Sequence, residues 1–348
     1  MSSRRVLVLQ VQVPFVRGGA EYLCEGLVTA LLRRGHLVEP LLIPFVHHPD
    51  CLLEQMLASR LFDFEQAGDV ALALKFPAYL CQHPRKRVWL LHQHRDAYDL
   101  WGHPHSSLSN HCEGAVLREA VWAADQLALP ESKDIFTISK NVSRRLKNYS
   151  GLDSSVLYPP LKQPLPDIRP QFEGFFFYPS RIEPNKRQDL AIRALACCGT
   201  QASLVLAGRA WDAVYEQFLR QLACQLGLAS RVHFLGEISE EEKLDLYARC
   251  QGVLFPTFDE DYGYVAAEAM SAHKPVIGCL DGGGVSELVV HQQTGYLCSA
   301  SPRSLSEAID ELYRSSVLAR SLGAQGGQHY REVVLSWDQV VDVLLAGL

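Results

Sequence analysis

The stretch GVLFPTFDEDYGYVAAEAM, residues 252–270, holds one complete unit of the pattern that decides the fold. Its apolar run GVLFPT predicts a buried β-strand, the acidic segment DEDYG predicts a loop, and YVAAEAM begins an alanine-rich helix. A buried strand that leads through a loop into a helix is the repeating unit of a parallel sheet covered by helices. The stretch therefore predicts an α/β fold.

Similar units precede and follow this stretch along nearly the whole chain of 348 residues. The alternation is interrupted at residues 156–174, where five prolines and few regular apolar positions predict a linker. We therefore expect two Rossmann-like domains with parallel sheets facing an interdomain cleft, at residues 1–160 and 161–330, and an amphipathic C-terminal helix within residues 331–348. The expected strands are residues 6–11, 37–43, 70–74, 87–92 and 135–139 in the first domain and 174–180, 202–208, 231–236, 252–257, 274–279 and 295–299 in the second.

The composition is that of an ordinary globular protein, with 48% apolar and 21% charged residues. The formal net charge of −6 gives no general attraction to nucleic acid or to anionic lipid, so we expect no nucleic-acid partner. The basic clusters Arg85-Lys86-Arg87 and Arg144-Arg145 are short, and we expect them to be solvated.

The sequence also indicates a cytoplasmic protein. No run approaches the roughly 18 to 20 apolar residues that a membrane span requires. The N-terminal stretch MSSRRVLVLQVQVPF has a basic start and an apolar run, but its alternation with Gln10 and Gln12 favours a first strand over a signal peptide. Ten scattered cysteines with no C-x-x-C spacing indicate buried, reduced thiols rather than disulfides or a zinc site.

Ligands of open α/β sheets bind beyond the carboxyl ends of the strands, so the loops after the strands are the places to search. In the first domain, Gly18 and Gly19 directly precede a helix, where backbone N–H groups could approach an anion closely; a plain tight turn is the alternative. The stretch LLHQHRDAYDLWGHPHS, residues 90–106, holds four histidines without H-E-x-x-H spacing or a cysteine partner. We interpret it as a polar loop that faces a substrate, and we expect no metal.

Two loops of the second domain carry charged pairs. Arg181 and Lys186 bracket a turn before a helix and could clamp a diphosphate, although ordinary surface charges would give the same pattern. Glu260 would lie in the loop over the cleft, and Gly263 would leave backbone N–H groups facing a ligand. Glu268, more than one turn into the helix, could accept hydrogen bonds from the two hydroxyls of a ribose. The simpler alternative is helix-dipole stabilisation plus one solvated glutamate.

The order of these features resembles that of a known enzyme family. R-x-x-x-x-K, then E-x7-E around a Tyr-Gly pair, then DGGGVSE at 281–287, are similar to motifs of the retaining GT-B glycosyltransferases of family 4, which include bacterial mannosyl- and glucosyltransferases. GGAE at 18–21, VLAG at 205–208 and VHFLGEIS at 232–239 extend the resemblance over much of the chain. It implies a GT-B fold in which the first domain binds the acceptor, the second binds the nucleotide-sugar donor, and the C-terminal helix returns to the first domain.

The resemblance also implies a role for each matching residue. Arg181 and Lys186 would stabilise the diphosphate, Glu260 would bind the donor sugar, and Glu268 would hold the ribose. His92, with His94 as second choice, would lie near the reacting centre. The donor-binding residues implied in addition to Glu268 are Gly18, Gly19, Gly208, Tyr262, Gly263 and Tyr264. Asp261 and Tyr262 replace the usual Gly-Phe inside the motif, which could alter the sugar contacts.

The expected reaction is transfer of a mannose- or glucose-type hexose from a nucleotide-diphosphate sugar to a hydroxyl of a saccharide or lipid-linked acceptor. The expected route is same-face substitution, because the family offers no settled carboxylate nucleophile. No organic cofactor is expected. With a lipid-linked acceptor, Arg85-Lys86-Arg87 would contact anionic lipid as a peripheral membrane site. The alternatives are a GT-B-fold epimerase of UDP-sugars and a non-catalytic nucleotide-sugar-binding protein.

Overall fold

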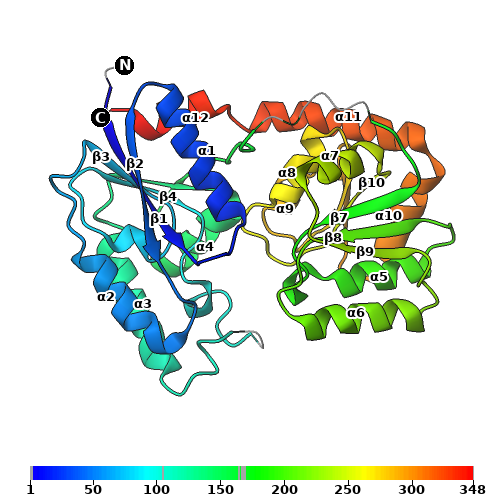
Figure 1. Ribbon diagram of the computed structural model, residues 1–348, viewed down its shortest axis with the longest axis horizontal. Coiled ribbons are helices and arrows are strands. Elements are labelled where there is room, and N and C mark those ends of the chain that lie inside the picture. The colour runs from blue at the N-terminus through cyan, green and yellow to red at the C-terminus, as the bar shows by residue number, and fades with distance from the viewer. Residues whose placement is uncertain (1–2, 104–105, 164, 166–169, 348) are drawn as a thin grey trace. The chain divides into compact units, whose positions relative to one another are not determined.

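The computed structural model describes residues 3–103, 106–163, 165 and 170–347. The chain forms two compact units (Figure 1). The first comprises Met1–Gln163 and Val334–Leu348, and the second comprises Pro164–Val333. The expected domain boundaries at 160/161 and 330/331 lie three residues before these divisions. Residues 164 and 166–169 of the expected linker lie outside the described residues.

The first unit contains one parallel six-stranded sheet with helices around it. The strands follow the order β2-β1-β3-β4-β5-β6. Every residue of β3 and β4 is buried, as is usual for strands of a parallel sheet that is covered on both faces. The strands are β1 (Arg5–Gln12), β2 (Leu37–Pro44), β3 (Val70–Ala73), β4 (Lys86–Leu90), β5 (Asp134–Thr137) and β6 (Ser155–Val156), and the helices are α1 (Gly19–Arg33), α2 (Leu52–Leu61), α3 (Gly114–Ala128), α4 (Lys140–Ser150), α12 (Trp337–Leu345) and the short 3-10 helices η1 (Pro49–Cys51), η2 (Ala78–Leu80) and η3 (Arg95–Ala97).

The C-terminal helix α12 is an integral part of this first unit. The Trp337 indole donates a hydrogen bond to the Leu161 carbonyl at 2.8 Å, and its ring meets Trp89 edge-on at 6.2 Å between centroids. Arg87 donates to the carbonyls of Leu344 and Ala346 at 2.6 and 2.5 Å, which are among the last carbonyls at this helix end. Because β4 and α12 are tied in this way, the end of the chain is fastened to the middle of the first sheet.

These bonds overturn the prediction that Arg85-Lys86-Arg87 is a solvated cluster that could contact lipid. Lys86 is fully buried, and its ammonium donates to the carbonyls of Tyr79 and Cys81 at 2.8 and 3.1 Å. Arg87 is 3% exposed and also pairs with Asp134 at 2.8 Å. Two of the three cations therefore lie inside the unit, because β4 is a central strand whose start is covered.

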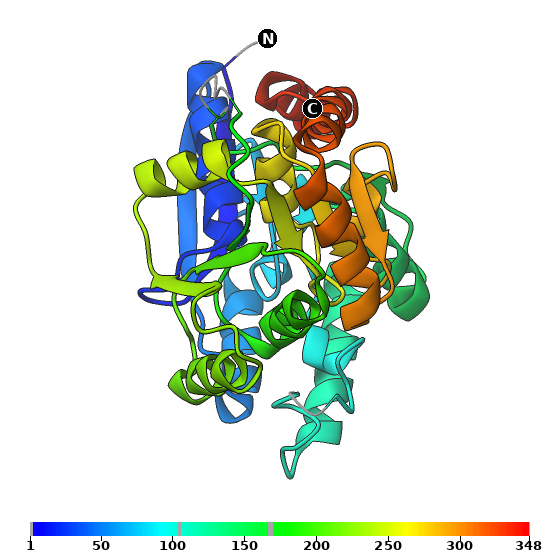
Figure 2. The ribbon, with the colours of Figure 1, turned by 90° about the vertical axis from the view of Figure 1, so that its right-hand side faces the viewer.

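The second unit repeats the architecture with a second parallel six-stranded sheet, in the order β12-β11-β10-β7-β8-β9. Figure 2 draws the elements of this unit in green to orange. Together the two units confirm the expected α/β class, and every expected strand is present to within two residues at either end. The strands are β7 (Phe175–Pro179), β8 (Ser203–Ala207), β9 (Val232–Gly236), β10 (Gly252–Phe255), β11 (Val276–Cys279) and β12 (Gly295–Cys298), and the helices are η4 (Pro184–Lys186), α5 (Gln188–Cys197), α6 (Ala213–Gln225), α7 (Glu240–Arg249), α8 (Tyr264–Ser271), α9 (Val285–Leu288), α10 (Pro302–Arg314) and α11 (Ser316–Val333).

Each sheet has one point where the strand order reverses direction. In the second unit the chain runs from β7 outward to β8 and β9, and then returns to place β10 on the other side of β7. In the first unit the corresponding reversal lies between β1 and β3. The loops that leave the two strands at such a point diverge to opposite faces and open a crevice, where open α/β sheets bind ligands. The loops after β7 and β10 are therefore the first place to examine.

The cysteines match their prediction only in part. All ten are free thiols, as expected, but only five of them are buried. Cys51, Cys112, Cys197 and Cys224 are exposed.

Within the described residues, no helix combines the length and apolar character that crossing a membrane would require.

Candidate functional site

The loops after β7 and β10 meet through one ion pair. The Lys186 ammonium donates to Glu260 Oε2 at 2.5 Å, and the same oxygen accepts from the Thr257 hydroxyl at 3.1 Å. The Lys186 side chain is only 9% exposed and that of Glu260 22% exposed. Lys186 ends η4, and Glu260 lies in the loop that precedes α8. The two residues that the sequence assigned to phosphate and sugar are thus brought together at the strand-order reversal.

Backbone and side-chain contacts fix these loops against one another. The Phe258 amide donates to the Asn185 carbonyl at 3.0 Å, and the Gly284 amide donates to the Glu260 carbonyl at 2.7 Å. Arg187 forms a bidentate pair with Asp281 at 2.9 and 2.8 Å. The loop with Lys186, the loop with Glu260 and the glycine-rich segment 281–284 therefore form one connected frame.

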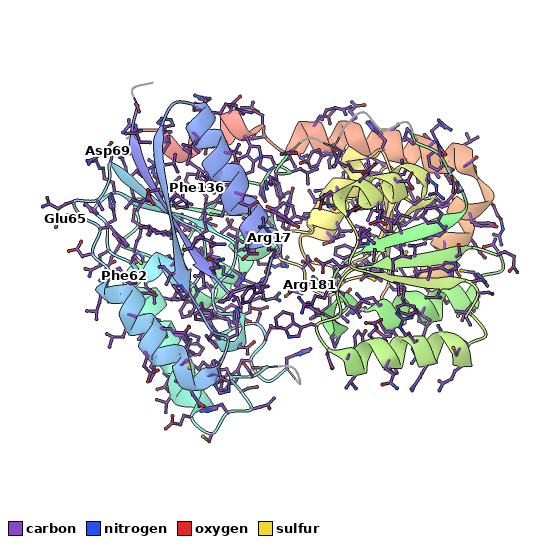
Figure 3. All side chains as sticks on the ribbon, in the orientation of Figure 1. Arg17, Phe62, Glu65, Asp69, Phe136 and Arg181 are labelled. Carbon is purple, nitrogen blue, oxygen red and sulfur yellow. The ribbon has the colours of Figure 1, made fainter. Side chains whose placement is uncertain are left out.

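Arg181 stands at the more open part of this frame. It lies after β7 (Figure 3), and its guanidinium pairs with Glu183 at 3.1 Å with 46% of the side chain exposed. Gly208 lies opposite on the loop after β8, where a Cβ would come within 2.1 Å of the Ser180 carbonyl oxygen. Its amide donates to the Gly236 carbonyl at 2.7 Å, so this N–H group already has an acceptor. Gly208 therefore serves to let the backbone pack closely beside Arg181.

Glu268 is held by two side chains of α7. Lys243 lies 3.1 Å from Oε1 of Glu268, and the Tyr247 hydroxyl donates to Oε2 at 2.8 Å. Lys243 also pairs with Glu240 at 2.9 Å, and these two carboxylates raise the pKa of its ammonium against the opposing effect of burial. Each oxygen of a carboxylate can accept more than one hydrogen bond, so a carboxylate oriented in this way can still bind hydroxyl groups.

Gly263 and the tyrosines on either side of it have unequal roles. Gly263 caps the start of α8 with φ of 96°, a left-handed conformation that favours glycine, and a Cβ there would lie 2.6 Å from a methyl group of Val285. Tyr262 is only 2% exposed, and its ring meets Tyr264 edge-on at 5.0 Å. The Tyr262 side chain therefore shapes the loop from within, and a ligand contact at this position would use the backbone.

In the first unit, Gly18 and Gly19 lie at the start of α1. Gly18 is the N-terminal cap, and its amide donates to the carboxylate of Glu21 at 2.7 Å. Glu21 thus occupies the position that an anionic ligand would take at this helix end. A ligand that used the Gly18 amide would have to replace this bond.

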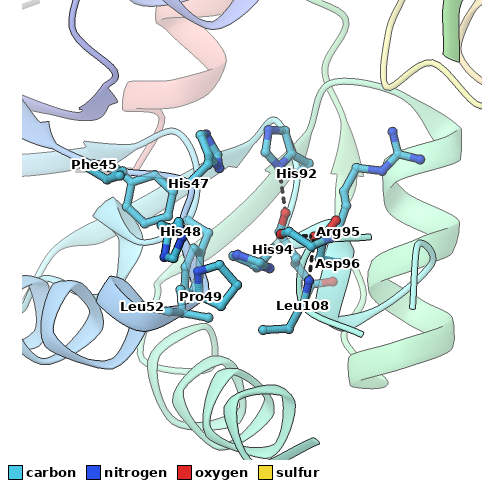
Figure 4. Close-up of a pocket in the computed structure, with 14 residues that line it drawn as sticks. Phe45, His47, His48, Pro49, Leu52, His92, His94, Arg95, Asp96 and Leu108 are labelled. Atoms are coloured by element: carbon cyan, nitrogen blue, oxygen red, sulfur yellow. Dashed lines mark hydrogen bonds between the residues drawn. The ribbon is translucent and has the colours of Figure 1, made fainter. Parts of the chain in front are cut away.

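His92 and His94 line a pocket of about 290 Å³ in the first unit (Figure 4). Burial lowers the pKa of His94, and burial together with Lys75 lowers the pKa of His47 to about 4. His92 Nδ1 lies 2.6 Å from the Gln93 carbonyl. Because a carbonyl only accepts, Nδ1 must carry a proton in this hydrogen bond. The residues around the pocket are Phe45, Val46, His47, His48, Pro49, Leu52, Phe76, His92, Gln93, His94, Arg95, Asp96, Ser107 and Leu108.

No group of three His, Cys, Asp or Glu side chains in the described part of the chain is placed to hold a metal ion. Of the four histidines in the 90–106 stretch, His105 lies outside the described residues.

Other side chains that contact the site residues could not be identified from the sequence. Lys243 and Tyr247 reach Glu268 from 25 and 21 residues away, and Arg187 reaches Asp281 over 94 residues. Only the fold brings these side chains together.

Comparison with known proteins gives a consistent result. Residues 168–329 match the family described as glycosyl transferases group 1. The chain is 31% identical to the alpha-1,3/1,6-mannosyltransferase ALG2 of Homo sapiens over 209 residues, which cover 53% of this chain and 50% of that protein. It is 29% identical to the D-inositol 3-phosphate glycosyltransferase of Mycobacterium marinum over 243 residues, 66% of this chain and 51% of that protein. The chain thus spans about half the length of these curated relatives.

Two solved structures resemble the whole chain. Anabaena HepE in complex with UDP and glucose gives a TM-score of 0.73 at 18% identity, covering 99% of this chain and 100% of that one. WaaG, a glycosyltransferase involved in lipopolysaccharide biosynthesis, gives a TM-score of 0.73 at 15% identity with the same coverage. At this level of identity the likeness carries the fold.

Proposed function

The chain belongs to the group 1 glycosyltransferases and has the GT-B fold, and from this premise we propose that it transfers a mannose- or glucose-type hexose from a nucleotide-diphosphate sugar to a hydroxyl group of a saccharide or lipid-linked acceptor. The proposed route is same-face substitution that retains the configuration of the sugar. The curated relatives are matched over about half their length, so the donor, the acceptor and the reaction are all part of the proposal.

The observation that carries the proposal is the Lys186–Glu260 pair at the strand-order reversal of the second sheet. It places a buried cation, suited to phosphate, 2.5 Å from a carboxylate, suited to sugar hydroxyls. A donor with both chemical groups, a diphosphate joined to a hexose, fits this pair. A ligand with phosphate alone would make no use of the Glu260 carboxylate.

The proposed roles of the site residues in the second unit follow from how charge moves in the reaction. Negative charge grows on the leaving nucleoside diphosphate as the bond to the sugar breaks. Lys186 and Arg181 would stabilise that charge, and Glu260 would hold the hexose hydroxyls. Glu268, oriented by Lys243 and Tyr247, would accept hydrogen bonds from the ribose.

The acceptor would bind in the pocket of the first unit that His92 lines. At neutral pH His47 is uncharged, because its pKa is about 4. Uncharged imidazoles beside the rings of Phe45 and Phe76 suit the hydroxyl groups and apolar faces of a saccharide. His92 would contact the reacting groups through Nε2, since Nδ1 is bonded to the Gln93 carbonyl.

We also propose that the reaction needs no divalent metal. Asp259 and Asp261 flank Glu260 in sequence, so the loop contains an Asp-Glu-Asp stretch that makes a direct test necessary. Turnover that is unchanged in excess EDTA would support metal independence. Turnover that is lost in EDTA and restored by Mg²⁺ or Mn²⁺ would refute it.

The decisive experiment is to incubate the full chain with UDP-glucose, UDP-N-acetylglucosamine, ADP-glucose and GDP-mannose, each with methyl and octyl glycosides as acceptors. Formation of a glycoside whose anomeric configuration, measured by NMR, equals that of the donor supports the proposal. An inverted product would refute same-face substitution. A C2 epimer of the donor would support the isomerase, and specific binding without any turnover would support a nucleotide-sugar-binding protein.

A further inference from the structure

A buried carboxylate lies behind the histidine pocket of the first unit. Asp125 of α3 is fully buried and accepts three hydrogen bonds. The Tyr79 hydroxyl donates to Oδ1 at 2.7 Å, while Gln93 Nε2 and the Tyr98 hydroxyl both donate to Oδ2 at 2.8 Å. All three donors are neutral groups.

A carboxylate in this environment is costly for the fold. Burial raises the pKa of Asp125 to about 6, and the three hydrogen bonds only partly oppose this effect. Without a cation among these partners, ionisation of the group works against folding at neutral pH.

The hydrogen bonds indicate what the acid holds in place. Gln93 lies between His92 and His94, and its side-chain amide also donates to the Ser150 hydroxyl at 3.0 Å. Tyr98 lies directly after η3 in the same segment. Oδ2 of Asp125 therefore binds two donors of residues 92–98, the segment that supplies His92 to the pocket, whereas Oδ1 binds Tyr79, which lies outside it.

The link continues to the imidazole of His92. The Gln93 side chain is fixed by Asp125, and the Gln93 carbonyl accepts from His92 Nδ1 at 2.6 Å. A shift of the Gln93 backbone would therefore turn the His92 ring or change its tautomer.

We propose that Asp125 is a positioning residue that, through Gln93 and Tyr98, holds the segment 92–98 so that His92 presents Nε2 to the acceptor pocket. This inference rests on the proposed role of the pocket as the acceptor site. A displacement of a reacting group by about 1 Å can lower a rate about 100-fold, so such support has a measurable effect.

Two isosteric variants separate positioning from simple stability. Tyr98→Phe and Tyr79→Phe each remove one hydroxyl donor from the same carboxylate, but only Tyr98 belongs to the segment with His92. We expect Tyr98→Phe to change the ¹H–¹⁵N signal of the His92 imidazole, assigned by its loss in His92→Ala, and Tyr79→Phe to leave that signal unchanged. Equal effects of the two variants on this signal would overturn the proposal.

Kinetics with a glycoside acceptor give the second readout. Asp125→Leu should lower the transfer rate about tenfold or more. Asp125→Asn should recover much of it, because an amide oxygen can still accept from Gln93 and Tyr98. Equal loss in both Asp125 variants would contradict the proposed role of Oδ2. The melting shift caused by UDP or GDP should be the same in all variants. If the wild-type protein showed neither transfer nor a nucleotide-induced shift, the proposed function would fail, whereas the His92 signal would still test the positioning role.

Discussion

The pair between Lys186 and Glu260 allows a sharp test of the donor site. Lys186→Met keeps most of the apolar stem and removes the ammonium that lies 2.5 Å from Glu260 Oε2. Loss of one preorganised group that stabilises transition-state charge costs about 3–4 kcal/mol, which corresponds to a fall in turnover of about 100- to 1,000-fold. We expect this loss in the rate constant rather than in the apparent affinity for the donor sugar.

The same substitution also perturbs the ligand-free protein. Glu260 keeps the Thr257 hydroxyl at 3.1 Å and is 22% exposed, so water can replace part of the lost interaction. We expect the free energy of unfolding to fall by about 1.5–3 kcal/mol, the usual contribution of a hydrogen bond to a charged group. In the double variant Lys186→Met/Glu260→Gln, no charge is left unpaired, so its loss of stability should be smaller than the sum of the two single losses.

The assay is release of the nucleoside diphosphate from the donor that the wild-type protein uses, measured at a temperature where each variant is fully folded by circular dichroism. Arg220→Met is a matched control, because Arg220 pairs with Glu216 on the exposed side of α6. A Lys186→Met turnover within about threefold of the wild-type value would refute the assignment of Lys186 to the leaving group.

Three further predictions concern stability. Gly263→Ala should lower the free energy of unfolding by about 2–4 kcal/mol in urea titrations, because φ is 96° and the new methyl group would lie 2.6 Å from Val285; adding Val285→Ala should restore only the steric part. Arg87→Ala should cost about 2–4 kcal/mol by releasing α12, and an unchanged urea midpoint would contradict this role. Burial lowers the pKa of Lys274 from 10.5 to about 8, so the folded protein loses this proton at lower pH than the unfolded chain. Stability should therefore rise between pH 8 and 10.5 by about 3 kcal/mol relative to Lys274→Met, and parallel pH profiles would refute it.

The sequence predicted the strands well because their signal is local. A buried parallel strand needs several consecutive apolar residues, and GVLFPT or RVWLLH display them directly. The loops that carry Arg181, Lys186 and Glu260 could be located in the same way, because they follow such strands. The contact between Lys186 and Glu260 required the order of the strands, which no local pattern specifies.

The burial of Lys86 and Arg87 and the role of Asp125 were missed by the sequence for one physical reason. Whether a charged residue is solvated depends on elements far along the chain. The sequence predicts Lys86 and Arg87 to be ordinary surface cations, yet they donate hydrogen bonds to carbonyls of η2 and α12. The sequence also gave no indication of the hydrogen bonds of Asp125, because its partners Tyr79 and Tyr98 lie 46 and 27 residues away.

The place of α12 in the first unit has a consequence for the order in which the protein folds during synthesis. The second unit is one continuous segment, Pro164–Val333, and all of it has been made before the last helix is translated. The first unit cannot be completed until residues 334–348 have left the ribosome, because α12 supplies Trp337 and the carbonyls that bind Arg87. The unit that begins first should therefore finish folding last. A chain truncated after residue 333 and released from the ribosome would have every residue of the second unit, but a first unit in which Trp89 lacks its partner Trp337.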